Sequence, residues 1–320
     1  MPQTRSVSLT GLLTAAGLIA GLASLTAFLG SFWWIFELTS HFRVQYALTL
    51  IIFSITLLWL RQWRVSATLA VIALLNLVVI APAFWPDQPT TSAIHAGKPP
   101  LRALLANVNL DNLDHDRIRR LIADAHPDVM VLLEISSGLI ERLGDLRKDY
   151  PHQVAELRDD PFGIVVLSRH PLSATQIILL GDSGPPAIVA VVTVGNRSFT
   201  VIGAHPWPPI SAEFAEGRNR QLAELAHLAR QIQTPLLVMG DLNTSPWSPY
   251  FARLLADSGL HDSRRGHGVQ PSWPVSLPPL WTPIDHVLFS RGIRILQRQI
   301  ASAMGSDHYP VIVEFQITDS

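Results

Sequence analysis

The stretch 236-LLVMGDLNTSPWSP-249 joins a short apolar run to a polar loop. The run ends at a glycine, and Asp241 and Asn243 follow two residues apart. Ordinary turn chemistry explains this pattern on its own, because Asp and Asn bond their own backbone while Gly, Ser and Pro punctuate loops. The alternative is a catalytic loop at the carboxyl end of a buried strand. The rest of the chain decides between the two.

Strand-like and helix-like segments alternate around this stretch. Short apolar or β-branched runs predict strands, and amphipathic runs predict helices. The predicted strands are 101–110, 128–135, 163–169, 187–194, 198–205, 235–241, 284–290 and 310–317, and the predicted helices are 114–126, 211–232 and 249–259. Some strands follow one another without a helix. We therefore expect two packed sheets with helices outside, an α/β sandwich over residues 101–320.

Three long apolar segments precede this domain, within residues 1–86. They are 9–36, 44–60 and 65–85, and none contains Asp, Glu, Lys or Arg. A helix that spans a bilayer needs about 20 apolar residues, with about 17 as the lower limit. The first segment is longer than the apolar core of a signal peptide. We expect three transmembrane helices, with a buried soluble helical hairpin as the alternative, and a Pro- and Thr-rich linker over 87–100.

Basic residues near the ends of these segments predict the orientation. Arg5, Arg61 and Arg64 would lie on one side, and Arg43 on the other. This bias places the N-terminus and the loop 61–64 inside. We therefore expect a multi-pass protein of the plasma (inner) membrane with an extracytoplasmic catalytic domain. The absence of cysteine excludes disulfides and thiolate chemistry.

Polar residues gather where the predicted strands end. The set is Asn107, Asn109, Glu134, His205, Asp241, Asn243, Asp285, Asp307 and His308. Taken singly, each is a turn former, a solvent-facing strand terminus or a satisfied core histidine. Together, carboxylates, amides and histidines without cysteine suit a hard cation such as Mg²⁺, beside which a carboxylate stays ionised and activates water. A histidine backed by an aspartate stabilises a phosphoryl oxygen, so the set indicates metal-assisted phosphate-ester hydrolysis.

The order NxN, E, H, GDxN, IDH and SDH across residues 101–318 resembles the endonuclease/exonuclease/phosphatase superfamily. DNase I-like nucleases, inositol polyphosphate phosphatases and sphingomyelinases share its fold. The resemblance implies a four-layered α/β sandwich and hydrolysis of a phosphoric ester or pyrophosphate. It implies Mg²⁺ as the cofactor, with Mn²⁺ as the alternative. It also implies that 240-GDLN-243 is a catalytic loop.

The resemblance assigns three residues to the metal. Asn107 matches the asparagine of the first strand, and Glu134 matches the metal-binding glutamate. Asp307 matches the second acidic residue, in the SDH motif. The family usually has Gln before this Glu, whereas this chain has Leu133, so one polar neighbour of the metal is absent.

The resemblance assigns five residues to catalysis. His205 matches the histidine that contacts the phosphate. Asp241 matches the carboxylate that orients or deprotonates the attacking water, and Asn243 matches the amide that stabilises the transition state. His308 matches the histidine beside the scissile phosphate, and Asp285 the carboxylate that orients it.

Further residues are candidates for substrate binding. Asn109 is the second amide of the NxN motif. Arg218 and Arg220, at the start of a predicted helix, would hold an anionic group, with a solvated helix face as the alternative. Trp207 and Trp273 would wall the cleft, with core or interface packing as the alternative.

The substrate has to be inferred from charge and membrane attachment, because this fold does not define it. Residues 101–320 contain 19 Lys and Arg against 23 Asp and Glu, a difference of −4. Nucleic-acid binders usually present a basic face, so nucleic acid is disfavoured. A hydrolase tethered by membrane spans meets lipid head groups at high effective concentration. We expect a phosphorylated lipid or lipid-linked phosphate as the substrate.

The layout of three spans and an outward catalytic domain resembles bacterial membrane members of the family of the glycopeptide-resistance type. This resemblance implies a polyprenyl pyrophosphate carrier as the specific substrate. Two alternatives remain open. One is a membrane-tethered nuclease of the same fold, and the other is a non-catalytic membrane scaffold.

Overall fold

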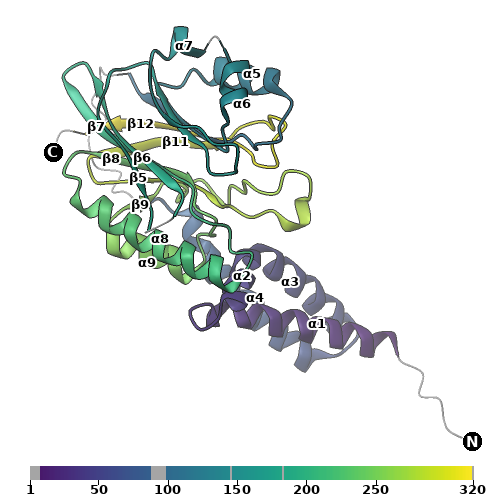
Figure 1. Cartoon of the computed structure of the whole chain (residues 1–320). Coiled ribbons are helices and arrows are strands. Elements are labelled where there is room, and N and C mark those ends of the chain that lie inside the picture. The colour runs from purple at the N-terminus through teal and green to yellow at the C-terminus, as the bar shows by residue number, and fades with distance from the viewer. Residues whose placement is uncertain (1–7, 88–98, 145, 182–183, 319–320) are drawn as a thin grey trace, which may run out of the picture. The chain divides into compact units, whose positions relative to one another are not determined.

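The chain forms two compact units in the computed structural model, which describes residues 8–87, 99–144, 146–181 and 184–318. The first unit comprises Met1–Pro82 with Trp247–Pro249, and the second comprises Ala83–Pro246 with Tyr250–Ser320. Most of the predicted linker 87–100 lies outside the described residues. Figure 1 shows helices alone at the N-terminal end of the chain and a mixture of strands and helices in the remainder.

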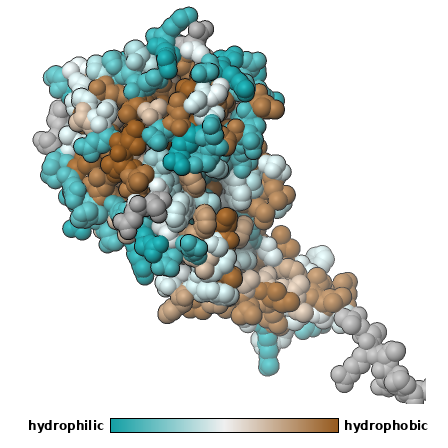
Figure 2. All heavy atoms as spheres, viewed as in Figure 1, coloured by the Kyte–Doolittle hydropathy of each residue, from teal (hydrophilic) through white to brown (hydrophobic). Residues whose placement is uncertain are grey.

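The first unit is built from apolar helices. They are α1 (Leu9–Thr26), α2 (Trp34–Thr39), α3 (Arg43–Trp59) and α4 (Trp63–Ile80), with 3₁₀ turns at Ala27–Leu29, Ser40–Phe42 and Ala81–Phe84. Three helical segments are long and apolar enough to cross a membrane, namely Leu9–Leu29, Trp34–Trp59 and Trp63–Phe84. Apolar residues cover most of the visible surface of this unit in Figure 2. Such a surface is stable only in an apolar environment, which supports the predicted membrane anchor.

The boundary between the first two spans differs from the sequence prediction. The predicted span 9–36 is interrupted at residues 30–33, and the predicted loop 37–43 is helical. Arg43 is buried, with Nη1 donating to Asn76 Oδ1 at 3.1 Å and the guanidinium 3.8 Å from the Phe28 ring centre. Arg43 is therefore a packing residue of the helical unit and should not be counted among the loop arginines that predict orientation.

The second unit contains two mixed sheets of six strands each. The first sheet has the order β11 (Ile293–Ile300), β12 (Val311–Ile317), β1 (Leu101–Asn107), β2 (Val129–Leu133), β4 (Ile164–Ser168), β3 (His152–Glu156). The second has the order β5 (Leu172–Leu179), β6 (Pro186–Val194), β7 (Arg197–Ala204), β8 (Leu236–Asp241), β10 (Asp285–Phe289), β9 (His261–Asp262). Each sheet contains one parallel pair, β1 with β2 and β7 with β8.

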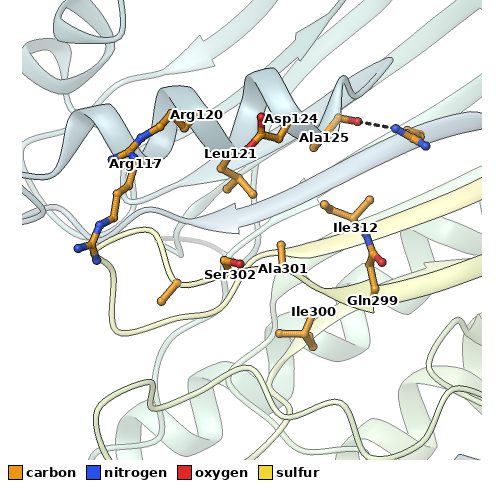
Figure 3. Close-up of a pocket in the computed structure, with 12 residues that line it drawn as sticks. Arg117, Arg120, Leu121, Asp124, Ala125, Gln299, Ile300, Ala301, Ser302 and Ile312 are labelled. Carbon is orange, nitrogen blue, oxygen red and sulfur yellow. Dashed lines mark hydrogen bonds between the residues drawn. The ribbon is translucent and has the colours of Figure 1, made fainter.

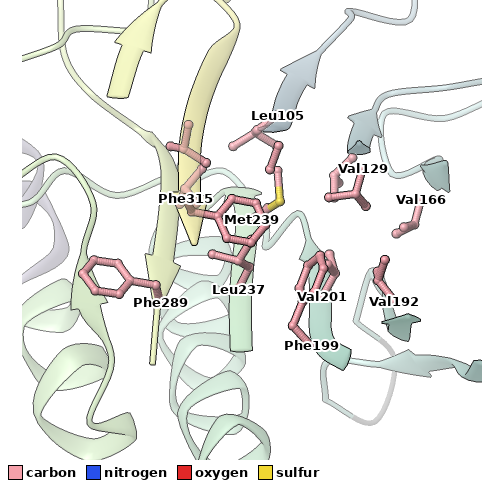
Figure 4. Close-up of a cluster of buried hydrophobic side chains, with 14 of the residues drawn as sticks. Leu105, Val129, Val166, Val192, Phe199, Val201, Leu237, Met239, Phe289 and Phe315 are labelled. Carbon is pink, nitrogen blue, oxygen red and sulfur yellow. The ribbon is translucent and has the colours of Figure 1, made fainter. Parts of the chain in front are cut away.

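The main core lies between the two sheets. Side chains from the first sheet, such as Leu105 and Val129, lie in one apolar cluster with Val201 and Met239 of the second (Figure 4). The rings of Phe199 and Phe315 meet edge to face at 5.3 Å between centroids. Full burial of one such side chain contributes about 1.5–3 kcal/mol, so this cluster supplies much of the stability of the unit.

Helices cover the outer face of each sheet. The first sheet packs against α5 (His115–Ala125), α6 (Ser137–Arg142) and α7 (Leu146–Asp149), and the second against α8 (Ala212–Gln231) and α9 (Pro249–Ser258). Side chains alternate along each strand, so Leu104 faces Ile118 of α5 while Leu105 faces the other sheet. The result is the predicted four-layered α/β sandwich.

Candidate active site

The strand pairings bring the polar residues of the motifs together. The parallel register of β1 and β2 sets Asn107 opposite Leu133, so Glu134 follows at the same edge of the first sheet. The antiparallel register of β8 and β10 sets Asp241 opposite Asp285. His205 comes directly after β7, the other neighbour of β8. Both sheets therefore contribute side chains to one place.

Three residues at this place have left-handed backbone conformations. The φ angles of Asn109, Glu134 and Asn243 are 61°, 59° and 49°. Asn tolerates this region, but a glutamate there costs roughly 1–3 kcal/mol and persists only when its surroundings hold it. The Glu134 carboxylate is held by the Leu110 N–H at 3.3 Å and the Asn107 side chain at 2.8 Å. The strained turn therefore fixes the direction of the Glu134 carboxylate.

Asn107 connects two carboxylates. Its Nδ2 donates to Glu134 Oε1 at 2.8 Å and to Asp241 Oδ2 at 3.3 Å. Its Oδ1 accepts the backbone N–H of Asn109 at 3.1 Å. The asparagine thus fixes the spacing between the Glu134 and Asp241 carboxylates.

Asp307 is held by two neutral donors. Asn109 Nδ2 donates to its Oδ1 at 2.7 Å, and Trp273 Nε1 donates to its Oδ2 at 3.0 Å. Burial raises the pKa of Asp307, but these hydrogen bonds and the charge of His308 outweigh burial and lower the pKa overall. The carboxylate is therefore ionised at neutral pH. Asn109 and Trp273 thus orient Asp307. The sequence predicted that both residues would contact the substrate and did not predict their contact with Asp307.

Asp241 lies among histidines at the centre of the site. Its Oδ2 is 3.5 Å from His205 Nε2 and 3.6 Å from His308 Nε2. His308 Nδ1 is 2.9 Å from Asp285 Oδ2, an arrangement in which the carboxylate accepts the ring proton. All four residues are buried.

The charges in this group stabilise one another. Burial raises the pKa of Asp241, but the charges of His308 and His205 outweigh burial and lower the pKa to about 2. Burial lowers the pKa of His308, and the nearby Asp285 and Asp241 outweigh burial and raise the pKa to about 10. The pKa of His205 is also raised, because Asp241 outweighs the effect of burial. At neutral pH the site therefore holds an Asp241 carboxylate beside a His308 imidazolium.

The catalytic loop is fixed from behind by a buried arginine. Arg218 is fully buried in α8, and its Nη1 donates to the backbone carbonyl of Asn243. Asn243 Nδ2 donates to the Pro206 carbonyl at 3.0 Å, and its N–H donates to Asp241 Oδ1 at 3.0 Å. Arg218 thus supports the loop, although the sequence predicted that it would contact the substrate.

Arg220 lies in α8, and Trp207 lies in the loop that precedes this helix. The Arg220 side chain is exposed and pairs with Glu216 at 3.1 Å, as the alternative of a solvated helix face predicts. Trp207 packs directly on Gly217. Any side chain at position 217 would place its Cβ 2.3 Å from the indole ring, so only glycine fits there. The Trp207 N–H donates to Gln221 Oε1 at 2.9 Å. Trp207 and Arg220 line one small cavity with Gln221, so they remain candidates for substrate contact.

Several supporting residues were not predicted. Ser306 Oγ donates to the Asn107 carbonyl at 2.8 Å and accepts the His308 N–H at 3.0 Å. Buried Arg298 donates to the Asp285 carbonyl at 3.1 Å, and His286 Nε2 donates to the Thr244 carbonyl at 2.8 Å. Ser306 is the first residue of the SDH motif and could have been found from it. His286 is the last residue of the IDH motif, but its contact with a backbone carbonyl cannot be inferred from the motif. Arg298 belongs to none of the motifs.

Two groups of side chains have the chemistry to hold a divalent cation. Asp241, Asp285 and His308 offer ligand atoms within 4.8 Å of one another. Within that group, however, His308 and Asp285 already contact each other at 2.9 Å, so these two ligand atoms are occupied with one another. The other is the set Asn107, Glu134 and Asp307 that the sequence assigned to the metal, whose side-chain oxygens are the kind of ligand that Mg²⁺ takes. The predicted set therefore fits a hard cation.

A separate cavity lies between α5 and the segment that follows β11 (Figure 3). It has a volume of about 600 Å³, and its lining includes Arg102, Arg117, Arg120 and Ser302. Arg102 pairs with Glu314 at 2.7 Å, and Arg117 with Asp114 at 2.9 Å. None of the motif residues lines this cavity. It is therefore distinct from the candidate active site.

Comparisons with solved structures give the same fold. The chain is similar to an endonuclease/exonuclease/phosphatase from Beutenbergia cavernae, with a TM-score of 0.58, 22% identity, and coverage of 69% of this chain and 72% of that chain. It is similar to one from Bacteroides vulgatus, with a TM-score of 0.59, 17% identity, and coverage of 69% and 100%. It is also similar to D. rerio TDP2 complexed with a single-strand DNA product, with a TM-score of 0.57, 16% identity, and coverage of 68% and 100%.

Sequence comparison defines the family. No curated protein matches the chain in sequence. The model of the Endonuclease/Exonuclease/phosphatase family matches residues 104–308, which is most of the chain and runs from β1 to His308. That range contains the Asn107, Asp241 and His308 side chains described above. The chain therefore belongs to the endonuclease/exonuclease/phosphatase family.

Proposed function

We propose that the chain is a membrane-anchored, divalent-metal-dependent phosphoesterase that hydrolyses the phosphorylated head group of a lipid. The observation that carries the proposal is the Asp241 carboxylate, which contacts two histidines and, through Asn107, the Glu134 carboxylate. Membership of a family of phosphoester hydrolases supports the reaction class. The three apolar helices support the membrane location.

Asn107, Glu134 and Asp307 would hold the cation, and His205, Asp241, Asn243, Asp285 and His308 would act on the phosphate. When bound, the cation would neutralise charge on the phosphoryl oxygens and lower the pKa of water. The φ of 59° at Glu134 and the paired donors on Asp307 prearrange these oxygens. Such prearrangement reduces the reorganisation that a transition state would otherwise require.

Asp241 would orient the attacking water. With a pKa of about 2, its carboxylate is ionised at neutral pH and accepts a hydrogen bond from water, but it is too weak a base to remove a proton from free water on its own. The water oxygen forms a bond to phosphorus while the bond from phosphorus to the leaving oxygen breaks, and the proton that the water loses is balanced by the proton that the leaving oxygen takes up. Proximity and alignment are therefore the main contributions of Asp241.

The histidines would stabilise the charge that develops on phosphate. His308 carries a proton at neutral pH, since its pKa is raised to about 10, and Asp285 holds its Nδ1. The His308 Nε2 proton would then be donated to a phosphoryl oxygen of the bound substrate instead of to Asp241. His205 Nε2 approaches the same Asp241 oxygen, so both rings point to one place. Donors aimed at developing charge are each worth roughly 10²–10³ in rate.

The substrate is proposed from the environment of the site. Residues 101–320 have a net charge of −4, from 19 basic and 23 acidic residues, which does not favour a polyanion. The spans keep the site close to lipid head groups at high effective concentration. A polyprenyl pyrophosphate carrier is the specific candidate. We propose that the catalytic unit is extracytoplasmic, on the strength of Arg61, between α3 and α4, and Arg64, in the first turn of α4.

Phosphate release from polyprenyl pyrophosphate tests this function. The full chain in detergent with Mg²⁺ should release phosphate, and release should stop with chelator and in Asp241→Ala. No release by folded protein from this lipid, from a phosphodiester lipid or from a soluble phosphate ester would refute the proposal and favour a non-catalytic scaffold.

A nuclease is the second candidate. The similarity to D. rerio TDP2, which was solved with a single-strand DNA product, favours including it. A labelled single-stranded oligonucleotide in the same assay separates the two functions. Cleavage of DNA without hydrolysis of lipid phosphate would favour the tethered nuclease.

A further inference from the structure

Two loops that leave the candidate active site carry exposed apolar side chains. The first begins at His205 and contains Ile210, which is 72% exposed. The second begins at Trp273 and contains Leu277 and Leu280, which are 47% and 39% exposed. We call Ile210, Leu277 and Leu280 the apolar rim. Contiguous exposed apolar groups usually mark an interaction surface.

Both loops start at residues that contact carboxylates of the candidate active site. His205 Nε2 faces Asp241 at 3.5 Å, and Trp273 Nε1 donates to Asp307 at 3.0 Å. The second loop is closed at its base, where Trp273 and Thr282 exchange backbone hydrogen bonds of 3.0 and 2.6 Å. The base of each loop is therefore fixed next to the candidate active site. A surface that covers the apolar rim would lie close to that site.

Prolines hold the rim in place. The first loop contains Pro206, Pro208 and Pro209, and the second contains Pro274, Pro278 and Pro279. Proline fixes φ near −65° and removes a backbone donor, so these loops have little freedom to fold their apolar side chains inward. The exposure of the rim is therefore built into the local sequence.

The absence of charge distinguishes these loops from the rest of the site. Residues 198–212 and 266–284 contain no Asp, Glu, Lys or Arg. The third loop at the site also exposes a leucine, Leu113, but it carries Asp111 and Asp114. An uncharged loop with exposed Leu, Ile and nearby Trp suits the boundary between lipid head groups and acyl chains, where indole rings are favoured.

A bilayer is within reach of this unit. The last candidate span runs to Phe84, and the next residues already belong to the α/β unit. Within that unit, Asp87 contacts His261 at 3.2 Å and Arg265 at 2.6 Å. Because a residue extends the chain by at most about 3.6 Å, the residues between Phe84 and Asp87 form only a short connection between the last span and this unit.

We propose that the apolar rim enters the lipid interface and presents the active-site mouth to phosphate groups at the bilayer surface. This inference rests on the membrane-bound hydrolase proposed above and identifies the bilayer as the partner of its active site. With the rim in the lipid interface, a lipid head group would reach the active site without leaving the membrane. A soluble ester would reach the same site without using the rim.

Single-cysteine labelling tests this contact directly, because the chain contains no cysteine. Full-length Ile210→Cys and Leu280→Cys, each labelled with an environment-sensitive dye, are reconstituted in vesicles of phosphatidylethanolamine and phosphatidylglycerol. Leu296→Cys on the edge strand β11, 36% exposed, is the matched control. Lipids with nitroxides on their acyl chains should quench the dyes at 210 and 280 and leave the dye at 296 unquenched. Equal quenching at all three positions, or none at 210 and 280, would overturn the proposal. Disulfide crosslinking of unlabelled Leu280→Cys between copies without quenching would instead indicate a second copy of the chain.

An activity measurement separates this inference from the proposed function. Ile210→Glu and Leu280→Glu should each lower hydrolysis of lipid phosphate in vesicles roughly tenfold, since charge is disfavoured at the interface. Hydrolysis of a soluble phosphate ester should not change, which also shows that the variants are folded. Leu296→Glu should change neither rate. If the wild-type chain hydrolyses neither substrate, the proposed function fails while the quenching result still decides the membrane contact. If it hydrolyses both and the rim variants do so equally, only the rim proposal fails.

Discussion

The two halves of the candidate active site hold carboxylates in different ways. In the amide half, Glu134 and Asp307 accept hydrogen bonds from Asn107, Asn109 and Trp273. In the imidazole half, Asp241 and Asp285 lie against His205 and His308. Amide and indole donors orient a carboxylate without cancelling its charge, whereas an imidazolium cancels it. The amide half therefore keeps its negative charge, as the proposed cation site requires, whereas the charge of the imidazole half is balanced by the histidines.

Removal of the central charge should have the largest effect. Asp241→Asn keeps the size of the side chain but removes the carboxylate that orients water and faces both histidines. We expect hydrolysis to fall by at least about 10³-fold, comparable with the loss of a central catalytic group. Mg²⁺ affinity, measured by calorimetry, should change far less. A large loss of Mg²⁺ binding would mean that the two halves share one function.

Glu134→Gln tests the other half. It keeps a hydrogen-bonding group but removes a formal charge from the proposed cation site. We expect activity at fixed Mg²⁺ to fall by roughly 10²-fold, with partial recovery as Mg²⁺ is raised, because metal ligands act through affinity. Rates measured across a Mg²⁺ titration check this. A lower rate with an unchanged Mg²⁺ requirement would contradict the division into two halves.

His286 supports the imidazole half from behind and should make stability depend on pH. Burial lowers its pKa from 6.5 to about 4, so the folded chain keeps it neutral while the unfolded chain takes up a proton below about 6.5. Its contribution is therefore fully present above pH 6.5 and is lost as the pH falls toward 4. The total is on the order of 3 kcal/mol.

His286→Gln, which retains a donor for the Thr244 carbonyl, isolates this contribution. Thermal unfolding of the variant and of the wild type is compared at pH 7.5 and pH 5. The variant should lose less stability on acidification than the wild type. An equal loss in both would show that other groups govern acid stability.

The smallest effect should come from Trp273→Phe. The change removes the indole donor to Asp307 but keeps an aromatic ring near His308. A single hydrogen bond of this kind contributes roughly 0.5–1.5 kcal/mol, so activity should fall about two- to tenfold. Trp281→Phe, in the same loop, is the matched control and should have less effect. Equal rates for the two variants would show that the hydrogen bond from the Trp273 indole to Asp307 does not contribute to activity.

The strands that the sequence predicted lie inside the two sheets. β1, β2, β4 and β8 consist mostly of apolar residues and are fully or almost fully buried. The strands that it missed, β3, β5, β9 and β11, lie at the four edges of the two sheets. β5, for example, is 172-LSATQIIL-179 and is largely exposed. An edge strand needs little apolar surface, so its sequence carries a weak signal.

The site residues likewise differ in how well the sequence predicted their contacts. Asp241, Asp285 and His308 were predicted to act together, and the structure places them within contact distance. Arg218 was assigned to substrate because it lies with Arg220 at the start of a predicted helix, and its residue type gives no information on burial. One of its partners, the Asn243 carbonyl, is a backbone group 25 residues away. Contacts to backbone atoms depend on the tertiary fold and cannot be inferred from residue types.

The position of β12 has a consequence for biosynthesis. β12 lies inside the first sheet, between β11 and β1, and pairs Phe315 with Leu101. During synthesis, β1 emerges long before its neighbour, and the loop that joins them spans nearly the whole catalytic unit. Such long-range pairing is slow, and an open edge invites wrong partners. The helices of the first unit are therefore synthesised before the second unit can close, and loss of Val311–Ile317 would remove an inner strand of the sheet.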